Sequence, residues 1–156
     1  MIKFLKIYLI LLLVILITGC SYKPILSKQN YNFFVEKVTL NGDEEINYII
    51  KERLINLKNQ NKKNKYYVQI ETSKVKNIIS NDSKGDPSKL EIIISSTFQI
   101  SNSEKLLIKR KVKMKNTYNN ISDKSKLEKY ELIIIKNLSQ RISDSIISTI
   151  ININDN

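Results

Sequence analysis

The segment "LEIIISSTFQISNSEKLLIKRKVKMK", residues Leu90 to Lys115, contains the pattern that decides the fold. Its first half alternates apolar with polar residues, which is typical of a β-strand with one buried face. The apolar positions on that face are Leu90, Ile92, Ile94, Phe98 and Ile100. Only Ser101 to Glu104 separate this stretch from a second one of the same period, and so short a connection favours a β-hairpin. We therefore predict two neighbouring antiparallel strands.

The second strand, Lys105 to Lys115, places lysines at alternate positions. Lys109, Lys111 and Lys113 share one face with Lys105 and Lys115, while the opposite face is mostly apolar (Leu106, Ile108, Arg110, Val112, Met114). Side chains two positions apart in a strand lie about 7 Å apart. Because such a row of like charges repels itself, it is either hydrated, as lysines that protect a sheet edge are, or it meets an anionic ligand.

Outward from the hairpin, further elements follow the same logic. Tyr66 to Val75 alternates as a half-buried strand, and Ser80 to Lys89 is rich in Asn, Asp, Gly and Pro, which predicts a loop. Phe33 to Leu40 is rich in β-branched and aromatic residues and predicts a first strand. Asp43 then suits the N-cap of a helix, whose core stripe would be Ile46, Ile49, Ile50, Arg53, Leu54 and Leu57.

A long helix is predicted at the C-terminal end, capped by Ser122 or Asp123. Its apolar stripe is Leu127, Tyr130, Ile134, Leu138, Ile142, Ile146 and Ile150. An amphipathic helix of this kind either lies on a membrane or covers a sheet. We favour the second, because its polar face is not strongly basic and because the apolar face of the sheet must be buried against something. We expect an α+β fold, a two-layer sandwich with two helices packed on one face of a four-stranded, mainly antiparallel sheet, in the order β-α-β-β-β-α.

The N-terminal residues have the pattern of an export signal. Lys3 and Lys6 precede an apolar run, Ile7 to Thr18, which is 12 residues long. A membrane-spanning helix needs about 20 apolar residues, so the run favours a cleaved signal peptide over an uncleaved anchor. Small residues follow it, and Cys20 is the only cysteine of the chain.

"ITGC", Ile17 to Cys20, resembles a bacterial lipobox. The resemblance implies a diacylglyceryl group on the Cys20 thiol, cleavage after Gly19, and an acyl chain such as palmitate on the new amine. A thiol made into a thioether cannot pair, which explains one cysteine in a secreted chain. We therefore divide the chain into a lipoprotein signal peptide (1–19), a lipidated tether (20–32) and a folded domain (33–153).

Composition limits the possible functions. The chain has no histidine, which excludes Ser-His-Asp and Cys-His catalysis and removes the commonest zinc ligand. It has no glycine-rich phosphate loop and no catalytic constellation, so we expect no enzyme, no cofactor and no metal site. The formal charge of +11 becomes +9 without Lys3 and Lys6. Outside the cytoplasm such charge is either a solvated surface or meets lipid headgroups, lipopolysaccharide or cell-wall polymer, not nucleic acid.

Several stretches together resemble the LptE family of lipopolysaccharide-assembly lipoproteins. These are the start of the mature chain, the first helix, the hairpin with its exit, and the last helix: "GCSYKPIL", "EINYIIKERLINL", "KLEIIISSTFQISNSEKLLIKRKVKMKNTYNN" and "KLEKYELIIIKNLSQRISDSII". The resemblance lies in architecture and pattern and spans nearly all of the mature chain.

The resemblance to LptE implies partners and a place. Proteins of this family plug the LptD β-barrel, assist its folding and help to deliver lipopolysaccharide to the outer leaflet. It implies a lipid anchor at Cys20, a position at the periplasmic face of the outer membrane, and lipopolysaccharide contact through basic residues, for which Lys109, Lys111 and Lys113 are the candidates. The alternative is a free-standing envelope lipoprotein, structural or binding anionic cell-wall polymer.

Overall fold

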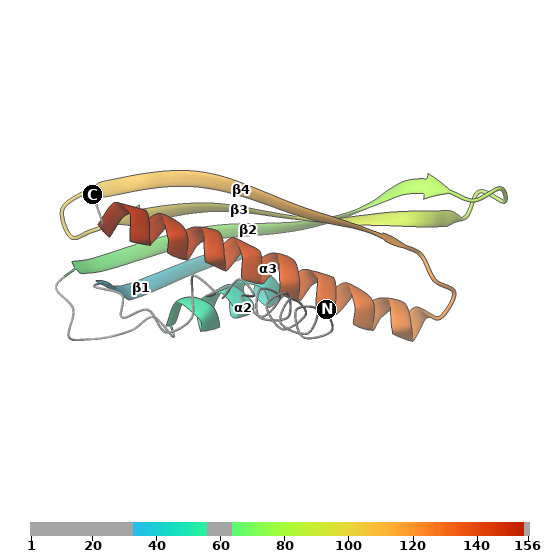
Figure 1. The fold of residues 1–156 in the computed structure, drawn as a ribbon, viewed down its shortest axis with the longest axis horizontal. Helices are drawn as coiled ribbons and strands as arrows, with labels where there is room; N and C mark the ends of the chain where they lie inside the picture. The colour runs from blue at the N-terminus through green and yellow to red at the C-terminus, as the bar shows by residue number, and fades with distance from the viewer. Residues whose placement is uncertain (1–32, 56–63, 155–156) are drawn as a thin grey trace, which may run out of the picture.

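The computed structural model describes residues 33–55 and 64–154 of the chain (Figure 1). The elements in chain order are β1 (Phe33–Gly42), α2 (Glu44–Ile55), β2 (Asn64–Asn81), β3 (Pro87–Ser101), β4 (Leu106–Asn119) and α3 (Lys124–Asn154). The predicted α+β class and the order β-α-β-β-β-α are confirmed. The predicted signal peptide, the tether with Cys20, and Leu57 lie outside the described residues.

The four strands form one sheet in the order β1-β2-β3-β4. β1 pairs with β2 in parallel, whereas β2–β3 and β3–β4 are antiparallel hairpins. Parallel neighbours need a crossover connection, and α2 supplies it between β1 and β2. The sheet is therefore mixed but mainly antiparallel, as predicted.

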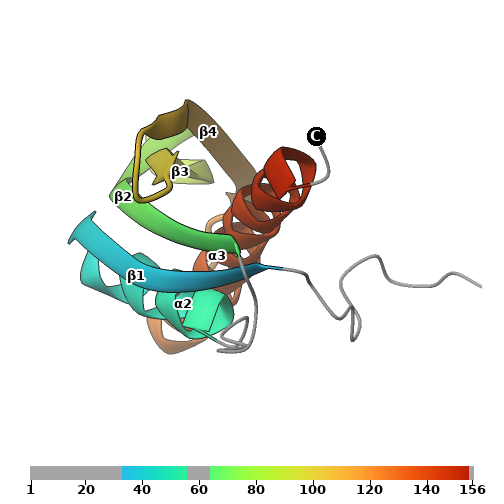
Figure 2. The ribbon, with the colours of Figure 1, turned by 90° about the vertical axis from the view of Figure 1, so that its left-hand side faces the viewer.

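The core lies between the sheet and the two helices, which cover the same face (Figure 2). The alternation predicted for the two central strands is confirmed, since Ile70 on β2 and Ile94 on β3 are at most 2% exposed. On α2, the buried residues are Ile46, Ile50 and Leu54. Ile49 and Arg53, which the stripe included, are only partly buried. Neither described helix has the length and hydropathy needed to cross a membrane.

Two sequence predictions are wrong in detail. Tyr130 is 48% exposed, because the buried stripe of a long helix drifts around its axis; its ring instead packs edge-on against Tyr118. The loop predicted at Ser80 to Lys89 is only half as long, since β2 continues to Asn81 and β3 begins at Pro87, which leaves residues 82–86 between the strands. A tight turn suffices there because the Asp82 carboxylate accepts hydrogen bonds from the backbone N–H groups of Lys84 and Asp86.

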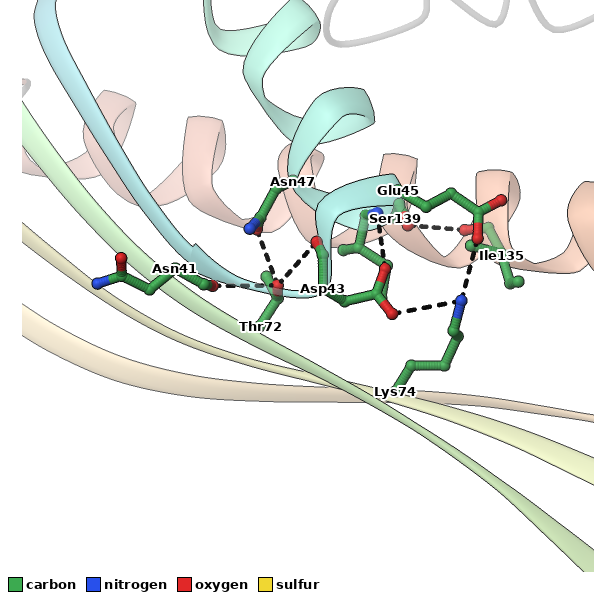
Figure 3. A network of polar contacts seen from close by, with 9 residues as sticks. Asn41, Asp43, Glu45, Asn47, Thr72, Lys74, Ile135 and Ser139 are labelled. Carbon is green, nitrogen blue, oxygen red and sulfur yellow. Dashed lines mark hydrogen bonds and ion pairs between the residues drawn. The ribbon is translucent and has the colours of Figure 1, made fainter.

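The turn from β1 into α2 is fixed by polar contacts with β2 (Figure 3). Asp43 caps α2 as predicted, its Oδ1 accepting a 3.1 Å hydrogen bond from the Ile46 N–H. The Thr72 hydroxyl donates to Asn47 Oδ1 at 2.8 Å. Gly42 has φ of +99°, and a Cβ there would lie 1.9 Å from the Thr72 carbonyl oxygen. Only glycine fits this close approach.

Candidate anion-binding face

The lysine row of β4 lies on the sheet face that the helices leave uncovered. Lys109, Lys111 and Lys113 pair with Gln99, Thr97 and Ser95 of β3, and all three lysines are exposed. On the opposite face of β4, Ile108, Val112 and Met114 are partly buried against the core. Because successive side chains point to opposite faces, the three ammonium groups project away from the helices.

Polar residues continue from the lysines across the uncovered face. The next strand, β2, continues the same rows on this face. Its Gln69, Glu71 and Ser73 pair with Gln99, Thr97 and Ser95 of β3, respectively. The only acid in these two rows is Glu71, two strands away from Lys111. This part of the sheet therefore offers a mostly uncharged hydrogen-bonding surface with one acid, Glu71, and a cationic margin along β4.

Of the lysines on this face of β4, Lys115 has an acidic partner, whereas Lys109, Lys111 and Lys113 have none among the described residues. Lys115 Nζ lies 3.2 Å from Glu91 Oε1 on β3, and the Glu91 residue is only 8% exposed. Within the described residues, no ion pair involves Lys109, Lys111 or Lys113. Three cations spaced about 7 Å apart can meet several phosphate groups of one ligand at once.

The position of β4 also supports the edge-protection interpretation. β4 is a terminal strand of the sheet, so one side of its backbone faces away from β3. Lysines on such a strand discourage pairing with other chains. The geometry thus agrees with both interpretations left open by the sequence.

A cleft between the two helices was not predicted from the sequence. It is an open cleft of about 440 Å³ lined by Tyr48, Ile49, Glu52, Arg53, Lys136 and Gln140. Arg53 also forms an ion pair with Asp144 on α3, 91 positions away in the chain. The sequence showed Arg53 inside an apolar stripe and Asp144 outside another, but it gave no means of pairing them. Arg53 is thus paired with Asp144, and the lining holds both a cation, Lys136, and an anion, Glu52, so the cleft carries no concentration of positive charge.

The acidic residues do not assemble a metal site. Within residues 33–55 and 64–154, no three acidic or other metal-ligating side chains lie together. The acids instead cap helices, close turns or pair with lysines, as Asp43, Asp82 and Glu91 do.

No protein-family model and no curated protein matches the sequence. Solved structures do match. The rare lipoprotein B from Shewanella oneidensis is 18% identical with a TM-score of 0.55, over 76% of this chain and 98% of that one. A lipoprotein B from Nitrosomonas europaea has a TM-score of 0.59 at 11% identity, over 82% and 90% of the two chains. A minor lipoprotein from Acinetobacter baumannii has a TM-score of 0.51 at 17% identity, over 72% of this chain and 91% of that one.

The chain shares its fold with bacterial lipoproteins. The likeness extends over about the whole length of those domains, so the two-layer arrangement is common to them and to this protein. At these identities the agreement is one of backbone fold and says nothing about the lysines of β4.

Proposed function

We propose that this protein is an outer-membrane lipoprotein of the LptE type, which plugs an LptD-like β-barrel and assists its folding during lipopolysaccharide transport. The observation that supports this most is the fold shared with rare lipoprotein B and other bacterial lipoproteins. It agrees with an independent feature of the sequence, the lipobox ending in Cys20.

The shape and surface suit such a plug. A two-layer domain with a closed apolar core is rigid, and the lumen of a large β-barrel is polar. Apart from Glu71, the uncovered face of the sheet presents Ser, Thr and Gln side chains in these rows of β2 and β3, which can hydrogen-bond to a polar wall. Two or more acyl chains on Cys20 hold the domain at the membrane, because one chain alone binds only marginally.

Lys109, Lys111 and Lys113 are the proposed contacts to lipopolysaccharide. Their ammonium groups are exposed, unpaired within the described residues and aligned on one face. Phosphorylated sugars supply several anionic groups at comparable spacing. Each lysine contributes little alone, so the row acts through its combined charge.

Co-purification tests the plug function. The full chain, expressed in its own cells with a C-terminal affinity tag, is extracted from the outer membrane in mild detergent. We expect an LptD-like barrel to be recovered with it in about equimolar amount, and mass spectrometry to show an acylated Cys20 as the first residue. Cys20→Ala is the matched control and should lose both membrane retention and the barrel. An acylated protein without a barrel would instead support the free-standing lipoprotein.

Charge reversal tests the lysine row separately. The triple variant Lys109→Glu, Lys111→Glu and Lys113→Glu should lower affinity for purified lipopolysaccharide by at least tenfold. The control reverses Lys51, Lys84 and Lys129, which are exposed and form no ion pair in the described part of the chain. Equal loss in the two triple variants, or none in either, would show that the row is not a binding site.

A further inference from the structure

Several elements begin or end together at one end of the sandwich. β1 and β2 both start there, with Phe33 opposite Asn64, and the short turn from β3 into β4 lies at the same end. α3 also finishes there, since Asn64 Nδ2 donates a 2.7 Å hydrogen bond to Asn154 Oδ1. Figure 2 looks onto this end. We call it the anchor end and define it by its rows, residues 33–40, 64–70, 98–110 and 148–154.

The segment that carries the proposed acyl anchor joins the domain at this end. Residues 20–32 lead into β1, so Cys20 lies at most about 47 Å from Phe33. The far end of β2, at Asn81, is about 60 Å from Asn64. A bilayer that holds Cys20 therefore has a higher effective concentration at the anchor end than at the far end.

The anchor end carries an excess of positive charge. Its cations are all exposed and outnumber its acids, Glu36 and Glu104: Lys37, Lys65, Lys105, Lys109 and Arg110. Among the described residues, only Lys65 of these cations has an ionic partner, Glu36 at 3.8 Å. Residues 148–154 of α3 add no charge, and Asp155 follows them. An exposed pair at 3.8 Å is weak, so the end is cationic.

The far end of the molecule differs in its charge balance. Four lysines there lie within 3.3 Å of a carboxylate oxygen of this chain: Lys74, Lys76, Lys115 and Lys126. The turn between β2 and β3 holds Asp82 and Asp86 against a single cation, Lys84. Acids thus offset most of the positive charge at the far end, whereas most of the charge at the anchor end is unpaired.

A polar hollow of about 240 Å³ opens on the anchor end. Its lining combines a cation with amide and hydroxyl groups: Asn64, Lys65, Tyr66, Asn102 and Ser103. Leu106, which follows the same turn, is 54% exposed. Cationic and hydrogen-bonding groups next to an exposed apolar side chain match the interface of a bilayer, where headgroups border on acyl chains.

We propose that the anchor end docks on the anionic phospholipid surface to which the acyl chains of Cys20 attach. A headgroup phosphate would lie beside Lys65 in the hollow, and Leu106 would meet the acyl boundary. Anionic lipids attract basic residues close to a membrane, and a lipid anchor combined with a basic patch binds more firmly than either alone. This inference rests on the acylation of Cys20 in the proposed function, but it needs neither a barrel nor lipopolysaccharide.

Charge complementarity favours the bilayer over other occupants. The two segments that join this end, 20–32 and 56–63, contain two and three lysines, respectively, and no acid. They therefore add to the positive charge and do not balance it. A second copy that presented the same end would be repelled as well. Anionic headgroups are complementary to this surface, and the anchor itself brings them to it, so no further protein is required.

The test uses the full acylated chain in lipid vesicles. Because Cys20 is the only cysteine and its thiol is acylated, an introduced cysteine takes a fluorophore selectively. Ser148→Cys reports on the anchor end and Ser83→Cys on the far turn; both serines are exposed. The vesicles are phosphatidylcholine with a quencher on some headgroups. Adding about 30% phosphatidylglycerol should raise quenching at position 148 about threefold, and 0.5 M salt should reverse the rise. Position 83 should change little.

Two matched triple variants assign the contact. The first removes the proposed contacts: Lys65→Gln, Lys105→Gln and Leu106→Ser. The second removes the same kinds of exposed residue at the far end: Lys84→Gln, Lys89→Gln and Ile78→Ser. The first variant should lose the response to phosphatidylglycerol, and the second should keep it. Serine in place of Ile25, Leu26 and Tyr31, the large apolar residues near the end of the segment 20–32, should also leave the response intact.

Every outcome decides. The proposal is overturned if phosphatidylglycerol has no effect at position 148, if position 83 responds equally, or if the two triple variants behave alike. Loss of the response in the variant of the segment 20–32 would assign the anchor end to that segment. Mass spectrometry of the purified protein comes first. An unmodified Cys20 would overturn the proposed anchor together with this inference, whereas an acylated chain without the response would overturn this inference alone.

Discussion

The phenol of Tyr118 on β4 donates a 2.7 Å hydrogen bond to Glu131 Oε1 on α3. The same carboxylate oxygen accepts a hydrogen bond from Lys76 Nζ on β2. One acid thus joins two strands to the last helix, near the turn by which the chain enters it. Burial by itself would raise the pKa of Glu131, but the hydrogen bonds from Lys76 and Tyr118, with the charges of Lys76 and Lys124, outweigh it and lower the pKa.

A carboxylate with a lowered pKa stabilises the fold in a defined pH range. Its contribution is complete above the pKa of the unfolded chain, about 4.3 for glutamate, and is lost as the pH falls through the lower folded value. Glu131→Gln should lower the free energy of unfolding by about 1 kcal/mol at pH 7, and the difference between the two proteins should disappear once the pH has fallen below the lowered pKa of Glu131. Urea unfolding followed by circular dichroism measures this; a difference independent of pH would contradict it.

Two glycines with positive φ allow a matched comparison. Gly42→Ala introduces a Cβ 1.9 Å from the Thr72 carbonyl oxygen, whereas Gly85→Ala, at φ of +89°, meets no atom within 4 Å. The backbone conformation alone costs roughly 1–2 kcal/mol for alanine. We expect Gly85→Ala to lose about that much, and Gly42→Ala clearly more, because β1 and α2 must move. Equal losses in thermal or urea unfolding would show that the contact with Thr72 is unimportant.

The contact of Arg53 with Asp144 joins the two helices across the cleft. Both side chains are about one-third exposed, at 35% and 36%, so solvent screens the charges. A double-mutant cycle with Arg53→Met and Asp144→Asn should give a coupling energy below about 1 kcal/mol. Urea unfolding of the four proteins measures it. A coupling of several kcal/mol would mean that the pair is effectively buried.

The lysine row should weaken the fold slightly at low ionic strength. Lys111 lies between Lys109 and Lys113 on one face, and like charges about 7 Å apart repel by roughly 0.6 kcal/mol even in bulk water. Lys111→Gln should therefore raise the free energy of unfolding by a few tenths of a kcal/mol to about 1 kcal/mol in 20 mM salt. The gain should shrink in 0.5 M salt.

Exposed Lys51 on α2 provides the control for this comparison. Lys51→Gln should change stability little at either salt concentration. If Lys111→Gln destabilised the protein, its ammonium group would have an attractive partner that the described residues do not show.

The sequence predicted the fold where side-chain periodicity records burial. Alternation along β3 identified Leu90, Ile92 and Phe98 as core, and all are at most 6% exposed. The sequence-based prediction failed at the ends of strands, which are determined by hydrogen bonds of the backbone. The ends of the β2–β3 hairpin are held by main-chain pairing, which is insensitive to side chains, so turn-forming residues extended the predicted loop too far.

The candidate site was predicted in part. Placing Lys109, Lys111 and Lys113 on one exposed face needed only the period of a strand. Two other contacts could not be predicted: that of Arg53 with Asp144, and those of Glu131 with Tyr118 and Lys76. They depend on which distant elements become neighbours, and one sequence contains no record of that. The end of β1 was hidden for the same reason, since the closeness of Gly42 to Thr72 arises only in the folded chain.

The parallel pairing of β1 with β2 has a consequence for the order of folding. β2, β3 and β4 are joined by tight turns and form hairpins with little loss of chain entropy, whereas β1 must wait for the whole crossover through α2 before its contacts form. We therefore expect β1, which precedes the other strands in the chain, to join the sheet last.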